Sequence, residues 1–177
     1  METAIVSIIC IALIVVGGMT MSQGFLSSVD TSSLGLEKVS ERDEGIMRTS
    51  LSTLSATQPA TNRVHVALQN NGQTKLGDFA KWDVIVQYYD SGGTYYVKWL
   101  PYTENVTLGD DQWRKKGIYL NSENLTAEVF EPGILNPGEE MVIEAKVYPP
   151  VGVGTSNLIV TSTPSGIPAS IGFSGFY

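Results

Sequence analysis

The N-terminal stretch TAIVSIICIALIVVGGMTMSQGFLSSV, residues 3–29, decides the fold of this chain. It contains no Lys, Arg, Asp, Glu or His, and Ser7 is the only polar residue between positions 4 and 16 apart from Cys10. A transmembrane helix needs about 20 mostly apolar residues, so the stretch is long enough to cross a bilayer. It therefore predicts a helix that is buried in lipid, in protein, or in each at different times.

Three interpretations of this helix compete: a secretory signal that is removed, a permanent membrane anchor, or a helix that leaves the membrane to build a polymer. A signal peptide has a basic region before its apolar run and a small-residue cleavage site after it. Here Glu2 precedes the run, and the first basic residue is Lys38. The missing basic flank disfavours the removed signal and also weakens the simple anchor, because anchors carry basic residues on their cytoplasmic side.

The composition limits the classes of partner. The chain has 177 residues, a net charge of −7 and a pI near 4.6, which fits one ordinary domain plus the N-terminal segment. An acidic chain has no long-range attraction for nucleic acid, so we expect no such partner. Cys10 is the single cysteine, so no disulfide forms within the chain, and it is interpreted as a small buried hydrophobe.

The next segment, residues 30–55, continues the helical pattern. Its apolar residues recur at spacings of three, four and seven, as on one stripe of a helix. A helix from residue 3 to about residue 54 would be roughly 75–80 Å long at 1.5 Å per residue, with a bend or break expected near Gly35 or Gly45. Pro59 cannot continue a helix, so residues 56–61 are predicted to form a hinge.

From residue 62 onward the hydrophobic period becomes two. Val64, Val66 and Leu68 alternate with more polar residues, and turn signals recur about every ten residues. The predicted fold class is therefore α+β: a long N-terminal hydrophobic α-helix in residues 1–55, then an immunoglobulin-like β-sandwich in residues 62–177. Strands are expected near residues 64–68, 82–89, 94–100, 105–108, 113–120, 126–130, 140–148, 157–163 and 169–176.

No enzyme signature is present, and we expect no catalytic residues and no cofactor. The single histidine, His65, lies in an alternating strand, where a histidine is far more often structural than catalytic. Asp110 and Asp111 are weak candidates for a metal site, because calcium takes 6–8 oxygen ligands and the pair lacks EF-hand spacing. Solvated loop acids are the favoured interpretation of this pair.

Two other features concern the surface of the sandwich. Asn105 and Asn124 begin N-x-[ST] sequons, which predict glycan attachment if the host glycosylates exported proteins. Trp82, Trp99 and Trp113 are interpreted as core or interface residues, and a carbohydrate-binding platform is the alternative.

The order of these segments resembles that of a known protein family. A charge-free N-terminal helix, an amphipathic continuation and a C-terminal sandwich are similar to archaellins and their relatives in the type IV pilin superfamily. Three stretches of the head carry the resemblance further: LQNNG at residues 68–72, DFAKWDV at 78–84, and LNPGE at 135–139 before the strand at 141–147. Type IV pilins commonly carry a glutamate at the fifth mature position, and Ile5 stands there instead, with Glu2 as the only nearby acid. That departure favours an archaellin-like subunit and leaves open whether Met1 is the processed N-terminus.

The resemblance implies a structural subunit of an archaellum-like helical motility filament, extracellular after assembly and inserted in the cytoplasmic membrane before it. Its partners would be other copies of itself, the membrane, and archaellum-type assembly machinery, and a basic leader would be cleaved by a dedicated peptidase. The alternatives are a type IV-like adhesive pilin, a membrane-anchored archaellum stator protein whose head binds the surface layer, and a membrane-tethered carbohydrate-binding module. The residues expected to make the polymerisation contacts are Ile5, Ile8, Ile9, Ile11, Ala12, Val15, Val16 and Met19.

Overall fold

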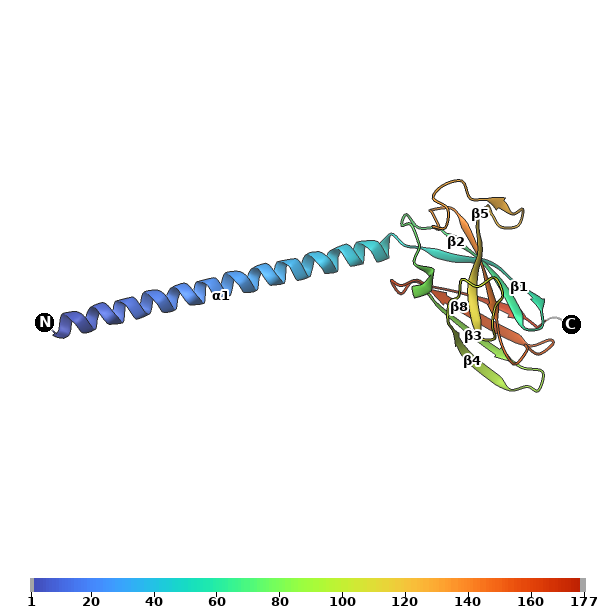
Figure 1. The fold of residues 1–177 in the computed structure, drawn as a ribbon, viewed down its shortest axis with the longest axis horizontal. Coiled ribbons are helices and arrows are strands. Elements are labelled where there is room, and N and C mark those ends of the chain that lie inside the picture. The colour runs from blue at the N-terminus through green and yellow to red at the C-terminus, as the bar shows by residue number, and fades with distance from the viewer. Residues whose placement is uncertain (1, 176–177) are drawn as a thin grey trace. The chain divides into compact units, whose positions relative to one another are not determined.

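The computed structural model describes residues 2–175, and the chain divides into two units, Met1–Glu44 and Gly45–Tyr177. The long helix α1 spans Glu2–Met47, and within the described residues nine strands follow it (Figure 1). This order confirms the predicted α+β class, with one apolar helix preceding an all-antiparallel β-sandwich.

The helix α1 is continuous over 46 residues, including Gly35 and Gly45, where the sequence suggested a bend or break. Several of its hydroxyl groups donate hydrogen bonds to backbone carbonyls of the same helix. The hydroxyls of Ser7 and Thr20 donate to the carbonyls of Thr3 and Gly17, both at 2.9 Å. A helix that pairs its backbone groups and its hydroxyls internally needs no outside polar partner, so it can sit in lipid or in a dry protein interface.

The end of the helix differs from the prediction. The helix ends at Met47, and the strand β1 runs from Leu51 to Ala60, so both the predicted helix to residue 54 and the predicted hinge at 56–61 are wrong. The apolar spacing of Leu51 and Leu54 suits a helical stripe, but Leu51 enters the core of the sandwich and Leu54 stays exposed. β1 is an edge strand, and an edge strand tolerates Pro59 because one side of its backbone makes no ladder bonds.

The short segment between α1 and β1 is held by the loop after β2. The backbone N–H groups of Asn71 and Gln73 donate to the carbonyls of Ser50 and Arg48, at 2.9 and 2.8 Å. Gly72 fits between them, because a Cβ at that position would lie 2.5 Å from the Ser50 nitrogen. Residues 48–50 are therefore fixed to the sandwich by backbone bonds.

The sandwich consists of two antiparallel sheets. The five-stranded sheet has the order β1-β2-β7-β5-β6, and the four-stranded sheet has the order β4-β3-β8-β9. A short 3-10 helix, η1, spans Phe79–Lys81 before β3. The remaining strands are β2 Arg63–Asn70, β3 Asp83–Tyr89, β4 Tyr95–Leu100, β5 Gln112–Asn121, β6 Thr126–Ala127, β7 Glu140–Lys146, β8 Ser156–Ser162 and β9 Pro168–Ser174.

This strand order is immunoglobulin-like. If the short β6 is left out, the other eight strands can be lettered A, B, C, C′, D, E, F and G in chain order. One sheet then has the order A-B-E-D and the other the order C′-C-F-G, as in immunoglobulin domains. Two strand predictions are wrong. Residues 105–108 form a loop in which Val106 is exposed, and only Thr126 and Ala127 of the predicted strand at 126–130 pair with β5.

The core lies between the two sheets and is built by packing alone. Trp82 is buried, donates from its ring nitrogen to the Gly77 carbonyl at 2.9 Å, and packs its ring 5.3 Å from that of Phe79. Trp113 is fully buried, and its ring lies 4.8 Å from that of Tyr102. Since the only cysteine lies in α1, no disulfide supports this core.

Candidate assembly surfaces

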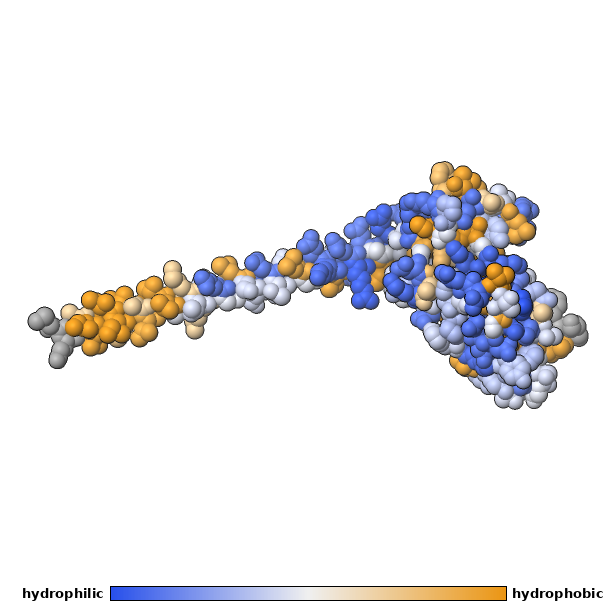
Figure 2. Space-filling view, in the orientation of Figure 1, coloured by the Kyte–Doolittle hydropathy of each residue, from blue (hydrophilic) through white to orange (hydrophobic). Residues whose placement is uncertain are grey.

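The first candidate surface is the apolar part of α1. It is the one helix among the described residues long and apolar enough to span a membrane, and none of its most apolar window is buried within the chain. Figure 2 shows hydrophobic residues covering the N-terminal part of α1, with hydrophilic residues increasing toward its C-terminal end. An exposed apolar surface of this extent marks a site of contact with lipid or protein.

The residues expected to make polymerisation contacts all lie on this surface. At 3.6 residues per turn, seven of the eight fall within an arc of about 120°, and Ile11 lies outside it. Val6, Leu13 and Ile14 cover the remaining sides and are also exposed, so the helix is apolar all round. The helix can therefore be surrounded by neighbours on every side, and which copy touches which residue stays a prediction.

The outer face of the five-stranded sheet carries a charged cluster. Glu144 on β7 is buried, and it accepts from the Arg63 guanidinium at 2.7 Å and from Nη2 of Arg114 at 2.6 Å. Burial alone would raise the pKa of Glu144, but the hydrogen bonds and charges of Arg114 and Arg63 outweigh it and lower that pKa. Glu144 is therefore a charged residue that fixes two guanidinium groups in place.

His65 belongs to the same cluster. Its Nε2 lies 3.6 Å from Oε1 of Glu144, and the ring is partly buried on β2. Burial lowers the pKa of His65, and the charge of Lys116 lowers it further, against the opposing effect of Glu144. Glu144 is also engaged by two arginines, so the arrangement orders the sheet surface and His65 shares its acidic partner with Arg63 and Arg114.

The weak metal candidates are each paired with a lysine. Asp110 lies 2.7 Å from the Lys146 ammonium, and Asp111 lies 2.5 Å from that of Lys98 and also accepts from the Tyr148 backbone N–H. Within residues 2–175 no group of three or more His, Cys, Asp or Glu side chains gathers where a metal ion would bind. The lysines neutralise both carboxylates, which leaves little electrostatic attraction for a cation.

The two sequons lie in exposed loops. Asn105 is in the loop between β4 and β5, and Asn124 is in the turn between β5 and β6. Each asparagine and the threonine two residues later, Thr107 or Thr126, is exposed. Glycan attachment at these positions is sterically open and stays a prediction.

The aromatic residues divide between core and surface. Trp82 and Trp113 are buried, whereas Trp99 is 58% exposed and donates from its ring nitrogen to Asp83 at 2.8 Å. Tyr89 and Tyr95 are exposed beside each other on β3 and β4, with ring centroids 5.0 Å apart. The predicted core role holds for two of the three tryptophans, and the third lies on the outer face of the four-stranded sheet.

Solved structures share this architecture. The structure of the archaeal flagellum of Methanospirillum hungatei matches with a TM-score of 0.60 at 12% identity, covering 96% of this chain and 91% of that one. The archaellum periplasmic stator protein complex FlaF and FlaG from Sulfolobus acidocaldarius matches with a TM-score of 0.51 at 20% identity, covering 70% of this chain and 87% of that one. No protein-family model and no curated protein sequence matches the chain.

These matches define the fold. The resemblance to archaellum proteins that the sequence suggested is confirmed at the level of the fold. The matched proteins are structural components of archaella. The sequence analysis missed the charged cluster on the outer face of the five-stranded sheet. Arg63 is 81 residues and Arg114 is 30 residues from Glu144 along the chain. Only the pairing of β2 and β5 with β7 brings the three side chains together.

Proposed function

We propose that this chain is the structural subunit of an archaellum-like helical filament and polymerises through α1. The observation that carries the proposal is the exposure of the apolar surface of α1, while the sandwich has a hydrophobic core of its own. The match to the Methanospirillum hungatei flagellum supports it, because a match over 96% of the chain includes the helix as well as the head.

The driving force for assembly is an exchange of apolar partners. Before assembly α1 is satisfied in the cytoplasmic membrane, since a helix pairs its own backbone groups. In the filament the same surface packs against helices of other copies, where several hundred Å² buried per neighbour contribute on the order of 10 kcal/mol at about 25 cal/mol per Å², before association costs. Repeated contacts that do not close into a ring produce a helical filament.

The proposed function implies the partners of this chain and its location. The chain's partners are other copies of itself, the membrane before assembly, and archaellum-type assembly machinery. The working state is an extracellular filament, in which this chain is a passive material with no catalytic role, and motion is generated elsewhere.

The test is the substitution Ile11→Asp. An aspartate there places an unpaired carboxylate in the dry helical core, which costs several kcal/mol in every subunit, so we expect no filaments. The control is Ser32→Asp, which adds the same charge to α1 beyond the apolar stretch and should leave assembly intact. Electron microscopy of the cells and of the sheared fraction gives the readout, with immunoblotting of membranes to verify that the variant is made. Normal filaments from Ile11→Asp would refute the helical-core arrangement.

The match to the stator complex supports a second candidate, a membrane-anchored archaellum stator protein. A stator subunit would keep α1 in the bilayer permanently and would form no filament of its own. Shearing intact cells separates the two functions, because a filament subunit is released into the medium and an anchored stator stays with the membrane. Loss of swimming on gene deletion favours either archaellum role, whereas loss of attachment alone would favour a type IV-like pilus.

A further inference from the structure

The outer face of the five-stranded sheet is hollowed at one end. Strands β1, β2, β5 and β7 surround an open depression of about 510 Å³, which we call the basic groove. Its lining residues are Pro59, Ala60, Arg63, His65, Arg114, Lys116 and Glu144. Three side chains with fixed positive charge face one carboxylate here, so the groove is positive on a chain whose net charge is −7.

The groove is held in shape before any ligand arrives. Glu144 bonds one nitrogen of Arg63 and two of Arg114, leaving the other guanidinium N–H groups of both arginines for an outside acceptor. Planar guanidinium groups fixed in this way suit carboxylates, which they bind with two parallel hydrogen bonds. The buried glutamate thus lowers the ordering cost of binding an anion.

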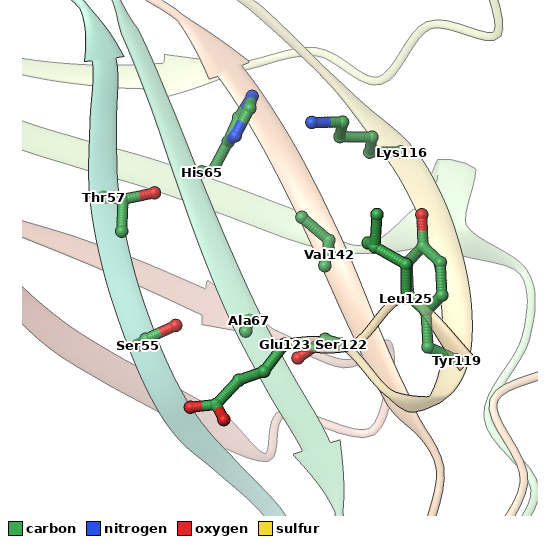
Figure 3. A pocket seen from close by; sticks show the side chains of 10 residues that line it. All are labelled: Ser55, Thr57, His65, Ala67, Lys116, Tyr119, Ser122, Glu123, Leu125 and Val142. Carbon is green, nitrogen blue, oxygen red and sulfur yellow. The ribbon is translucent and has the colours of Figure 1, made fainter. Parts of the chain in front are cut away.

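Lys116 completes the groove through a β-bulge. Along β5, Lys115 is opposite Ile143 and Gly117 is opposite Val142, so Lys116 is the extra residue of the bulge. A bulge redirects the side chain that it carries, and Lys116 is exposed with no ion pair among the described residues. Figure 3 shows Lys116 and His65 pointing toward each other, while Glu123 lies at the other end of the adjoining hollow.

The same chain carries a surface of opposite charge on α1. At 3.6 residues per turn, Asp30, Glu37, Glu41 and Glu44 fall within an arc of about 60°, which we call the acidic stripe. Lys38 and Arg42 lie to one side of it. Glu37 and Glu41, which are four residues apart on the helix, repel one another, so a positive group near this pair would relieve that repulsion.

We propose that the basic groove of one subunit binds the acidic stripe of a second copy of this chain, through carboxylates such as Glu37 and Glu41. The proposal rests on the proposed filament, in which helices and sandwiches of different copies lie against one another. The groove opens at the start of β2, whereas α1 joins the sandwich beside the loop that follows the end of β2. At about 3.3 Å per residue these positions are roughly 17 Å apart along the strand, and the unfolding measurements described below distinguish a stripe of the same copy from a stripe of another copy.

Charge reversal tests the contact. In Lys116→Glu and in Glu41→Lys an attraction becomes a repulsion, so the concentration of unassembled subunit should rise about threefold or more, and filaments should dissolve at lower salt. The double variant restores opposite charges and should recover most of the wild-type assembly. Sedimentation of purified filaments between 0.05 and about 1 M NaCl measures both, because the screening length falls from more than 10 Å to about 3 Å over that range.

Two controls separate this contact from other effects. Lys81→Glu reverses an exposed lysine on η1, outside the groove, and should assemble like the wild type. Thermal unfolding of each variant as a detergent-solubilised chain should be unchanged, because the contact forms between copies.

The outcomes distinguish this inference from the proposed function. Wild-type filaments together with full assembly of both single variants would overturn the groove contact and leave the filament proposal intact. Absence of wild-type filaments would refute the filament, and with it the groove contact. A lower unfolding temperature of the solubilised Lys116→Glu and Glu41→Lys chains, rescued in the double variant, would place the contact within one copy and overturn the proposal. Reduced binding of Lys116→Glu filaments to polyanion-coated beads, with unchanged salt tolerance, would assign the groove to an outside anion and overturn it as well.

Discussion

The apolar helix and the sandwich differ in whether their hydrophobic side chains are buried within the chain. The sandwich covers its own hydrophobic residues, and Val64, Leu68, Ile143 and Val147 are at most 1% exposed. The apolar stretch of the helix, residues 3–29, is exposed throughout, and Ile14 on α1 is 74% exposed. Apolar side chains of similar size therefore stabilise the fold in one region and can only stabilise an assembly in the other.

This difference predicts that the sandwich determines the folding stability of the head, whereas the helix determines assembly. A folded sandwich needs only this chain, whereas the helix needs lipid or other copies to remove its surface from water. Substitutions in the two regions should consequently act on different measurements, unfolding of the head in one case and polymerisation in the other.

The largest expected effect on the head is that of Trp82→Ala. The substitution removes a buried ring, its contact with Phe79 and the hydrogen bond to Gly77, so the free energy of unfolding should fall by about 3–5 kcal/mol. The matched change on the helix is Ile9→Ala, which should leave head unfolding within about 0.5 kcal/mol while weakening assembly. Denaturant unfolding followed by tryptophan fluorescence and near-UV circular dichroism in detergent measures both. An equal loss in the two variants would show that helix and sandwich do not stabilise independently.

A smaller effect is expected for Gly72→Ala. A Cβ at position 72 would lie 2.6 Å from the Arg48 carbonyl oxygen, so the backbone of residues 48–50 would have to move. Overpacking of this kind costs about 1–3 kcal/mol, measurable as a lower unfolding temperature of the head. Gly77→Ala is the control, because no atom lies within 4 Å of its added Cβ. Unchanged stability of Gly72→Ala would mean that the segment after the helix is free to shift.

The smallest effect is a pH dependence confined to the head. The folded-state pKa of His65 is lowered from 6.5, and that of Glu144 is lowered from 4.5. Both groups are then less protonated in the folded than in the unfolded chain, so stability is fully present above pH 6.5 and falls as the pH drops, first through His65 and below pH 4.5 also through Glu144. His65→Gln should flatten the upper part of that curve. A stability that rises on acidification from pH 7 to 5 would contradict the assignment for His65, and one that rises below pH 4.5 would contradict that for Glu144.

The sequence was sufficient for the helix and for most strands, because long apolar runs and period-two alternation are local signals. It failed at residues 51–60, where Leu51 and Leu54 fit a helical spacing but the pairing of β1 with β2 decides the structure. It also failed at residues 105–108, which form a loop with Val106 exposed instead of the expected strand. Tertiary pairing overrode local pattern in both places.

For the candidate sites too, the sequence was informative only where the residues lie near one another in the chain. The residues predicted to make polymerisation contacts could be proposed from sequence because they lie close together on one helix, and their role stays a prediction. The basic groove could not, because Arg63, Arg114 and Glu144 come from three strands whose order is set by the fold.

The most direct test of the central claim uses the single cysteine, Cys10, which lies in the apolar part of α1 and is exposed within one chain. Purified, lipid-free filaments are treated with a water-soluble maleimide, and the labelled fraction is compared with that of subunits dissolved in denaturant. If helices of neighbouring copies bury one another, Cys10 stays unlabelled in filaments and reacts completely after they dissolve. Labelling of intact filaments as fast as of dissolved chains would show that α1 faces water in the assembled state, and would contradict the account.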